Sequence, residues 1–167
     1  MNKTESKEFA KRRRQLMRMM GENSIAILPS APVRVRNRDV DYPYRQDSDV
    51  LYLTGFEEPE SLMVLVPGRE HGEFILFCRE SDPVMETWHG RRAGQAGAVE
   101  QFHADDSFPI DDIDEILPGL MERCDRVYYS MGRDPSNDQR VMGWVNEIRK
   151  QGRAGTHVPH EFVSLDF

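Results

Sequence analysis

The chain has few cysteines, no long apolar run and no excess of positive charge. Its 167 residues include two cysteines, Cys78 and Cys124, which lie far apart in apolar contexts without the Cys-x-x-Cys spacing of a redox or zinc site. We expect both to be buried as small hydrophobic residues. No run of about 20 apolar residues is present, and the N-terminus lacks the apolar segment of a secretory signal. The sequence therefore predicts a cytoplasmic protein without a membrane partner.

The charge balance argues against nucleic acid as a partner. With 22 Lys and Arg against 29 Asp and Glu, the formal net charge is -7, which gives no general attraction to phosphate backbones. The one strongly basic segment, residues 7–18, places its apolar residues at helical spacing. This pattern predicts a helix that packs one side on the core and leaves a basic face in solvent.

Alternating strand and helix patterns predict an α/β domain. Residues 24–28, 63–66, 74–77 and 126–130 have the short apolar runs of buried strands, and Pro67-Gly68 with Gly72 predicts a hairpin between the second and third. Residues 137–150 predict a helix with one apolar stripe that ends before Gly152. A hairpin followed by strand–helix units favours a mixed β-sheet flanked by helices. No linker or repeat interrupts residues 1–167, which we expect to form a single domain.

Two segments leave alternatives open. Residues 50–54 suit either a strand or a short helix that is capped near Ser48 and ends at Gly55. Residues 113–121 have helical spacing, but Pro118 predicts two short helices or a kink, with Asp111 and Asp112 as caps.

No motif in the chain supports catalysis alone. The glycine-rich residues 88–97 lack the preceding strand and the Lys-Ser/Thr ending of a phosphate loop. His157 and His160 would need a helix to act together as metal ligands, and Pro159 lies between them. The acidic residues 105–115 lack the EF-hand pattern, and no nucleophile–base pair is suggested. We therefore expect no catalytic residue and no metal site in this chain.

Arginine and aromatic residues gather in the middle of the chain, at residues 34–45 and 88–92. Such residues are enriched at interaction hot spots, but Tyr42, Tyr44 and Trp88 would serve equally well as core residues. The residues alone leave both interpretations open, an interaction surface or core packing.

Several segments together resemble one family. They are residues 9–14 (FAKRRR), 42–49 (YPYRQDSD), 52–56 (YLTGF), 58–60 (EPE), 88–94 (WHGRRAG) and 161–166 (EFVSLD). The combination is similar to the N-terminal domain of the Xaa-Pro aminopeptidases (aminopeptidase P), which are related to prolidase and creatinase. The resemblance implies a ribonuclease H-like, three-layer α/β fold that precedes a C-terminal pita-bread catalytic domain, which is absent from this chain.

The resemblance also implies a role in a metalloenzyme. In this family two Mn(II) ions, held by Asp, Asp, His, Glu and Glu of the catalytic domain, activate water to cleave the bond between an N-terminal residue and a following proline. We therefore expect an N-terminal domain that serves oligomerisation, as a homodimer or homotetramer, and restricts access of peptide substrate. The isolated chain should be inactive.

The family likeness suggests roles for five residues. Trp88 would border the substrate in a neighbouring subunit's active site, Asp39 and Arg153 would belong to a hydrogen-bond network toward the catalytic domain, and Arg91 and Arg92 would make subunit contacts. Two alternatives stay open: a stand-alone, non-catalytic module that binds peptides or proteins, and a related dipeptidase or amidinohydrolase with the same domain plan.

Overall fold

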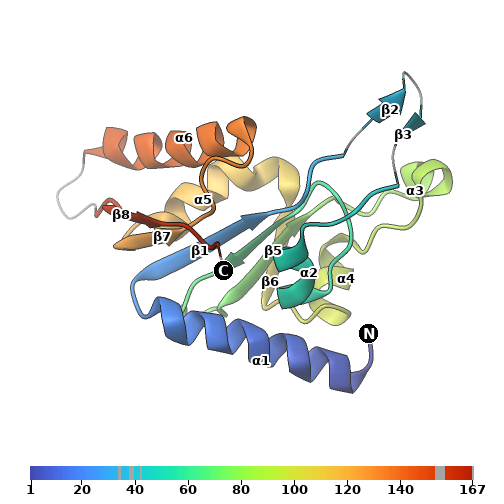
Figure 1. The fold of residues 1–167 in the computed structure, drawn as a ribbon, viewed down its shortest axis with the longest axis horizontal. Coiled ribbons are helices and arrows are strands. Elements are labelled where there is room, and N and C mark those ends of the chain that lie inside the picture. The colour runs from blue at the N-terminus through green and yellow to red at the C-terminus, as the bar shows by residue number, and fades with distance from the viewer. Residues whose placement is uncertain (34, 38–39, 42, 153–156, 167) are drawn as a thin grey trace.

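The computed structural model describes residues 1–33, 35–37, 40–41, 43–152 and 157–166. A mixed, six-stranded sheet with strand order β6-β5-β4-β1-β7-β8 runs through the centre (Figure 1). The elements are α1 (Lys3–Met20), β1 (Ser24–Pro29), β2 (Val35–Asn37), β3 (Val40–Asp41), α2 (Ser48–Thr54), β4 (Leu62–Leu65), β5 (Phe74–Cys78), α3 (Pro83–His89), α4 (Gly94–Glu100), β6 (Asp106–Pro109), a 3-10 turn η1 (Ile110–Asp112), α5 (Ile113–Met121), β7 (Arg126–Tyr128), α6 (Pro135–Gln151) and β8 (Glu161–Val163).

Strand β1 lies at the junction between the antiparallel and parallel parts of the sheet. It pairs antiparallel with β4, with Ala26 opposite Leu65, and parallel with β7, with Ala26 opposite Tyr128. Strands β4 and β5 form the predicted antiparallel hairpin, while β6 and β8 add parallel strands at the two edges. The predicted mixed sheet is confirmed.

Each face of the sheet carries its own apolar cluster. Successive residues of β1 point to opposite faces, so Ala26 and Leu28 join one cluster while Ile25 and Ile27 join the other. Helices α1, α2 and α4 contribute to the first cluster, and α5 and α6 contribute to the second (Figure 1). The result is a helix–sheet–helix arrangement with β1 buried on both sides, as predicted for a three-layer α/β domain.

The caps of the helices settle the open segment at residues 50–54 in favour of a helix. The Asp47 carboxylate accepts hydrogen bonds from the backbone nitrogens of Asp49 (3.0 Å) and Val50 (3.1 Å), which start α2. The helix ends at Gly55, whose φ of 72° is left-handed and suits glycine.

The expectation of two short helices separated at Pro118 is wrong, while the alternative of a kink stays a prediction. Helix α5 continues through Pro118, which is buried together with Leu117 and Met121 against the sheet. Proline removes one backbone hydrogen bond, and the apolar burial of this short helix offsets that loss. The expected capping by Asp111 and Asp112 is also wrong, because Asp112 occupies the N-cap position without a side-chain hydrogen bond.

The basic helix is less solvated than predicted. Leu16 and Met20 are buried as expected, but so is Arg13, whose guanidinium donates to the Leu53 carbonyl at 2.9 Å and lies 4.2 Å from the centre of the Phe74 ring. Arg12 donates to the neighbouring Tyr52 carbonyl at 3.0 Å. Burial lowers the pKa of Arg13 to about 10, which leaves it charged at neutral pH. The two cations thus satisfy carbonyls in the last turn of α2.

Short elements escaped the sequence analysis. Strand β6 is half-buried and strand β8 is exposed along its length, so neither has the apolar run of a buried strand. Both cysteines are free and buried, as predicted. Among the described residues, no helix is long and apolar enough to cross a membrane.

A pair of glycine substitutions tests the packing of α1 against α2. A Cβ at Gly55 would lie 2.8 Å from Cε2 of Phe9, and the φ of this residue is +72°. We expect Gly55→Ala to lower the free energy of unfolding by about 1–2 kcal/mol, because steric overlap adds to backbone strain. Urea unfolding followed by circular dichroism measures the change.

The matched control is Gly143→Ala, in the middle of α6, where a Cβ would meet nothing within 4 Å. This variant should raise the free energy of unfolding by about 0.5–1 kcal/mol because alanine loses less backbone entropy on folding. Equal effects of the two substitutions would contradict the described packing.

Candidate functional site

Helix α3 presents an apolar surface to solvent. Val84 and Trp88, four residues apart, are 69% and 79% exposed, and Met85 beside them is 38% exposed. None of the helix's residues is buried. Figure 1 shows α3 at the same end of the molecule as the β2–β3 hairpin, away from the layered core. Exposed apolar surface that gathers on one element is typical of a contact site for another molecule.

Local polar contacts hold this short helix in place. Asp82 caps its first turn by accepting from the backbone nitrogens of Val84 and Met85, and Pro83 occupies the first position. At the other end, the Glu86 carboxylate accepts from the backbone nitrogen of Arg92 at 2.8 Å. The helix is therefore fixed by its own caps rather than by a buried face.

Glu58 connects α3 to the body of the domain. One of its carboxylate oxygens accepts from the backbone nitrogen of Ala93 at 2.9 Å, and the other lies 3.4 Å from the Arg79 guanidinium. The segments 52–60 and 88–94, which are far apart in the sequence, therefore meet at this carboxylate.

Gln46 fixes the segment that carries Glu58. Its side-chain oxygen accepts from the backbone nitrogens of Ala31 (3.0 Å) and Asp47 (2.9 Å), and its amide donates to the carbonyls of Phe56 (3.2 Å) and Glu58 (2.9 Å). The side chain is buried, with 6% of its residue surface exposed. Tyr44, which we considered for the core or an interface, is half-buried beside it and donates to the Ala31 carbonyl at 2.6 Å.

The five residues singled out from the sequence fall into three groups. Trp88 and Arg91 are exposed at the end of α3 and in the loop that follows it. Arg92 is half-buried and donates to the Glu80 carbonyl at 3.3 Å, so its guanidinium already has a partner within the domain. Asp39 and Arg153 lie outside the described residues.

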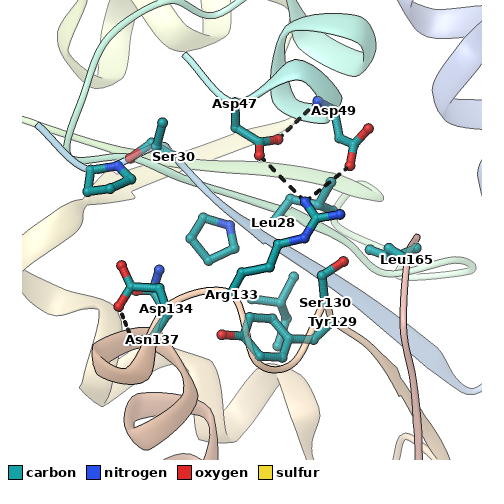
Figure 2. A pocket seen from close by; sticks show the side chains of 14 residues that line it. Leu28, Ser30, Asp47, Asp49, Tyr129, Ser130, Arg133, Asp134, Asn137 and Leu165 are labelled. Carbon is teal, nitrogen blue, oxygen red and sulfur yellow. Dashed lines mark hydrogen bonds and ion pairs between the residues drawn. The ribbon is translucent and has the colours of Figure 1, made fainter. Parts of the chain in front are cut away.

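A separate cavity of about 280 Å³ opens at the carboxyl ends of β1 and β7, where α6 begins. Figure 2 shows Arg133 extending toward Asp47 and Asp49 of the α2 N-terminus, with Tyr129 and Ser130 on the opposite side. The nearest guanidinium nitrogen is 3.9 Å from a carboxylate oxygen of each aspartate, and Arg133 also contacts Asp166. Open α/β sheets commonly bind ligands at such a position.

Two carboxylates in and beside this cavity have pKa values that are shifted in opposite directions. Burial, and then the nearby Asp47 charge, raise the pKa of Asp49. The hydrogen bond from Ser164, and then that from Arg133, lower the pKa of Asp166. Because Arg133 already faces three carboxylates, it has little attraction left for an anionic ligand. The cavity is best described as the place where the segment containing Leu165 and Asp166 is held against α2 and the loop before α6.

Metal-ligating groups come together elsewhere. Within the part of the chain that the structure describes, the group of His, Cys, Asp or Glu residues close enough to share an ion consists of Asp125, His157 and His160. The sequence argument that the two histidines need a helix does not hold, because the loop that leads into β8 places both beside Asp125. None of these residues lies in the cavity of Figure 2.

Comparisons with known proteins agree with this architecture. The sequence model of the aminopeptidase P N-terminal domain matches residues 9–128. The chain belongs to the aminopeptidase P N-terminal domain family. It is 36% identical to Xaa-Pro aminopeptidase of Escherichia coli over 164 residues, which cover 98% of this chain and 37% of that protein.

Solved structures of family members have the same fold. Aminopeptidase PepP of Pseudomonas aeruginosa is 60% identical with a TM-score of 0.94 over 96% of this chain and 36% of that one. Proline aminopeptidase P II of Yersinia pestis is 36% identical with a TM-score of 0.89 over 95% and 37% of the two chains. This aminopeptidase P domain therefore spans a little over a third of each of these three proteins.

The sequence analysis singled out exposed residues of α3 such as Trp88, but it did not find the buried and half-buried residues that hold this helix in place. Glu58 and Glu86 accept hydrogen bonds, and Gln46 both accepts and donates them, with partners up to 35 residues away in the chain. The available signal was that Gln46 and Glu58 fall inside the family segments 42–49 and 58–60. Spacing alone carries no information about such distant backbone partners.

Substitution of Arg133 tests the electrostatics of the cavity. We expect Arg133→Gln to raise the pKa of Asp166 toward its ordinary value and to raise that of Asp49 further, because the positive charge favours both ionised forms. The measurement is a carbon-detected NMR titration of the aspartate carboxyl groups.

The free energy of unfolding should depend on pH through the same carboxyl groups. The pKa of Asp166 is lowered in the folded state, so its ionised form stabilises the fold above the unfolded pKa, and this contribution is lost as pH falls through the folded pKa. The variant should therefore lose most stability at pH values above the unfolded pKa of about 3.9, and the loss should shrink as pH falls below that value. Arg140→Gln, which removes an exposed cation 3.8 Å from Asp114, is the control and should leave Asp49 and Asp166 unchanged. Identical titrations of the wild type and Arg133→Gln would contradict the described contacts.

Proposed function

We propose that this chain is the N-terminal, oligomer-forming and substrate-restricting domain of a dimetal Xaa-Pro aminopeptidase. In this proposal a catalytic domain holds two Mn(II) ions and cleaves the bond between an N-terminal residue and a following proline. The partners of the domain are that catalytic domain, further copies of the same protein, and the peptide substrate. A cytoplasmic location stays a prediction from the sequence.

Family membership and coverage support this role. This chain matches about a third of the length of the relatives named Xaa-Pro aminopeptidase. In the solved structure of a family member, that part has the same fold as this chain. A divalent pair can lower the barrier by positioning the attacking water and stabilising the developing oxyanion. In the cavity of Figure 2, the Arg133 guanidinium lies 3.9 Å from the carboxylates of Asp47 and Asp49, so these two groups already have a cationic partner. The proposal therefore places the two ions in the catalytic domain.

The observation that carries the proposal is the exposure of Trp88. An indole that is 79% exposed leaves a large apolar surface in water unless another molecule covers it. Hydrogen bonds fix helix α3 at both ends, so the backbone that carries Trp88 has a defined position. A flat, apolar ring suits packing beside a substrate proline or exclusion of water from a neighbouring subunit's active site.

The first test is the activity of the chain by itself. We expect the purified chain, supplied with Mn(II) and an Xaa-Pro-Xaa peptide, to release no more N-terminal amino acid than a blank without protein. The complete Escherichia coli enzyme under the same conditions is the positive control. Turnover that is abolished by a chelator and elutes with the chain in gel filtration would contradict the assignment of the metal pair to another domain.

The second test is the substitution Trp88→Ala in the complete enzyme that contains this chain. Loss of an aromatic contact worth about 1–1.4 kcal/mol should lower kcat/KM for a tripeptide about five- to tenfold, while Trp88→Phe should retain most of the activity. Separate values of KM and kcat, together with the mass of the assembly in solution, distinguish a substrate contact from a loss of oligomerisation.

Met142→Ala is the matched control, since Met142 is a 55% exposed apolar residue on α6. It should change neither the kinetics nor the assembly. Unchanged kinetics and mass for Trp88→Ala would remove this residue from both roles.

A further inference from the structure

Residues 157–160, which lead into β8, bring two histidines to the start of β7. Ligand atoms of Asp125, His157 and His160 all lie within 4.8 Å of one another. Nε2 of His157 is 2.5 Å from Oδ1 of Asp125, and the two imidazole rings are 6.2 Å apart and perpendicular. Three side chains from two distant segments therefore point to one position.

Backbone contacts hold the two segments together. The Asp125 carbonyl accepts from the backbone nitrogens of His160 (3.0 Å) and Glu161 (3.1 Å), and the Asp125 nitrogen donates to the Asn23 carbonyl at 2.7 Å. Between the histidines, Pro159 is buried, which fixes the loop against the domain. The main chain thus sets the ligands' relative position without any ion.

The ligand chemistry selects a class of cation. Two imidazoles and one carboxylate are typical ligands of Zn²⁺ and related transition ions, whereas Mg²⁺ and Ca²⁺ prefer oxygen alone. Ligands about 2.0 Å from a tetrahedral Zn²⁺ lie about 3.3 Å from each other, so the Asp125–His157 pair must open by roughly 1 Å. Both side chains are 46% exposed and have room to do so.

The charges next to the ligands offset each other. Oε1 of Glu161 lies 3.6 Å from Nε2 of His160, and the same carboxylate is paired with the Arg126 guanidinium at 2.7 Å. The carboxylate that would bind the ion is therefore that of Asp125. Three protein ligands leave a fourth tetrahedral position for water.

We propose that Asp125, His157 and His160 form a binding site for one Zn²⁺-type divalent ion. The bound ion joins the start of β7 to the loop that enters β8 and so clamps the exposed edge strand to the sheet. This inference is independent of the proposed peptidase role, because it concerns only residues of this chain.

The experiment is a calorimetric titration of the metal-free chain with Zn²⁺. We expect one ion per chain, and at least tenfold weaker binding for the double variant His157→Ala with His160→Ala. His71→Ala, which removes an exposed loop histidine elsewhere, is the matched control and should bind as the wild type does. Equal Zn²⁺ binding by the wild type and the double variant would overturn the proposal. A loss of Zn²⁺ binding in His71→Ala as large as that in the double variant would also overturn it.

A measurement on the unmutated chain covers the case in which the double variant does not fold. In histidine-selective ¹⁵N NMR, one equivalent of Zn²⁺ should shift the ring signals of His157 and His160 and leave those of His71, His89 and His103 in place. Shifts spread evenly over the 5 histidines would show non-specific surface binding and overturn the site.

Discussion

The exposed end of this domain depends on one buried amide. Gln46 joins the segment after β1, the start of α2 and the segment after α2, because its side-chain oxygen accepts and its side-chain nitrogen donates hydrogen bonds. A nonpolar residue at this position would leave several backbone groups without partners, at roughly 1–3 kcal/mol for each buried group. Since Glu58 lies in the segment that Gln46 holds, and Glu58 binds the Ala93 nitrogen, the base of α3 depends on the same amide.

These hydrogen bonds give the exposed Trp88 indole a defined position although its helix has no buried face. A helix of seven residues is not stable through its own propensity, and α3 buries no side chain that would anchor it. The cap at Asp82 and the two carboxylates Glu58 and Glu86 take the place of that anchor. A side chain that must meet a partner benefits from such support, because less conformational freedom is lost on contact.

The sequence predicted what depends on local pattern. The buried strands at residues 24–28, 63–66 and 74–77 and the helix ending at Gly152 were found because apolar runs and glycine stops are local signals. Strands β6 and β8 were missed because they are short edge strands without a run of buried apolar residues. The uninterrupted α5 and the meeting of His157 with Asp125 were missed for a different reason: both are decided by packing between segments, which overrides local rules. Asp39 and Arg153 fall outside the described residues and stay predictions.

Opposite pKa shifts around one cavity usually point to an acid–base pair, since catalysis needs groups that titrate apart. Here the same shifts have a structural cause. Asp49 is partly buried beside Asp47, while Asp166 gains hydrogen bonds from Ser164 and Arg133. The guanidinium faces all three carboxylates, so its positive charge is compensated within the domain. The interactions around this cavity therefore hold residues 164–166 against α2.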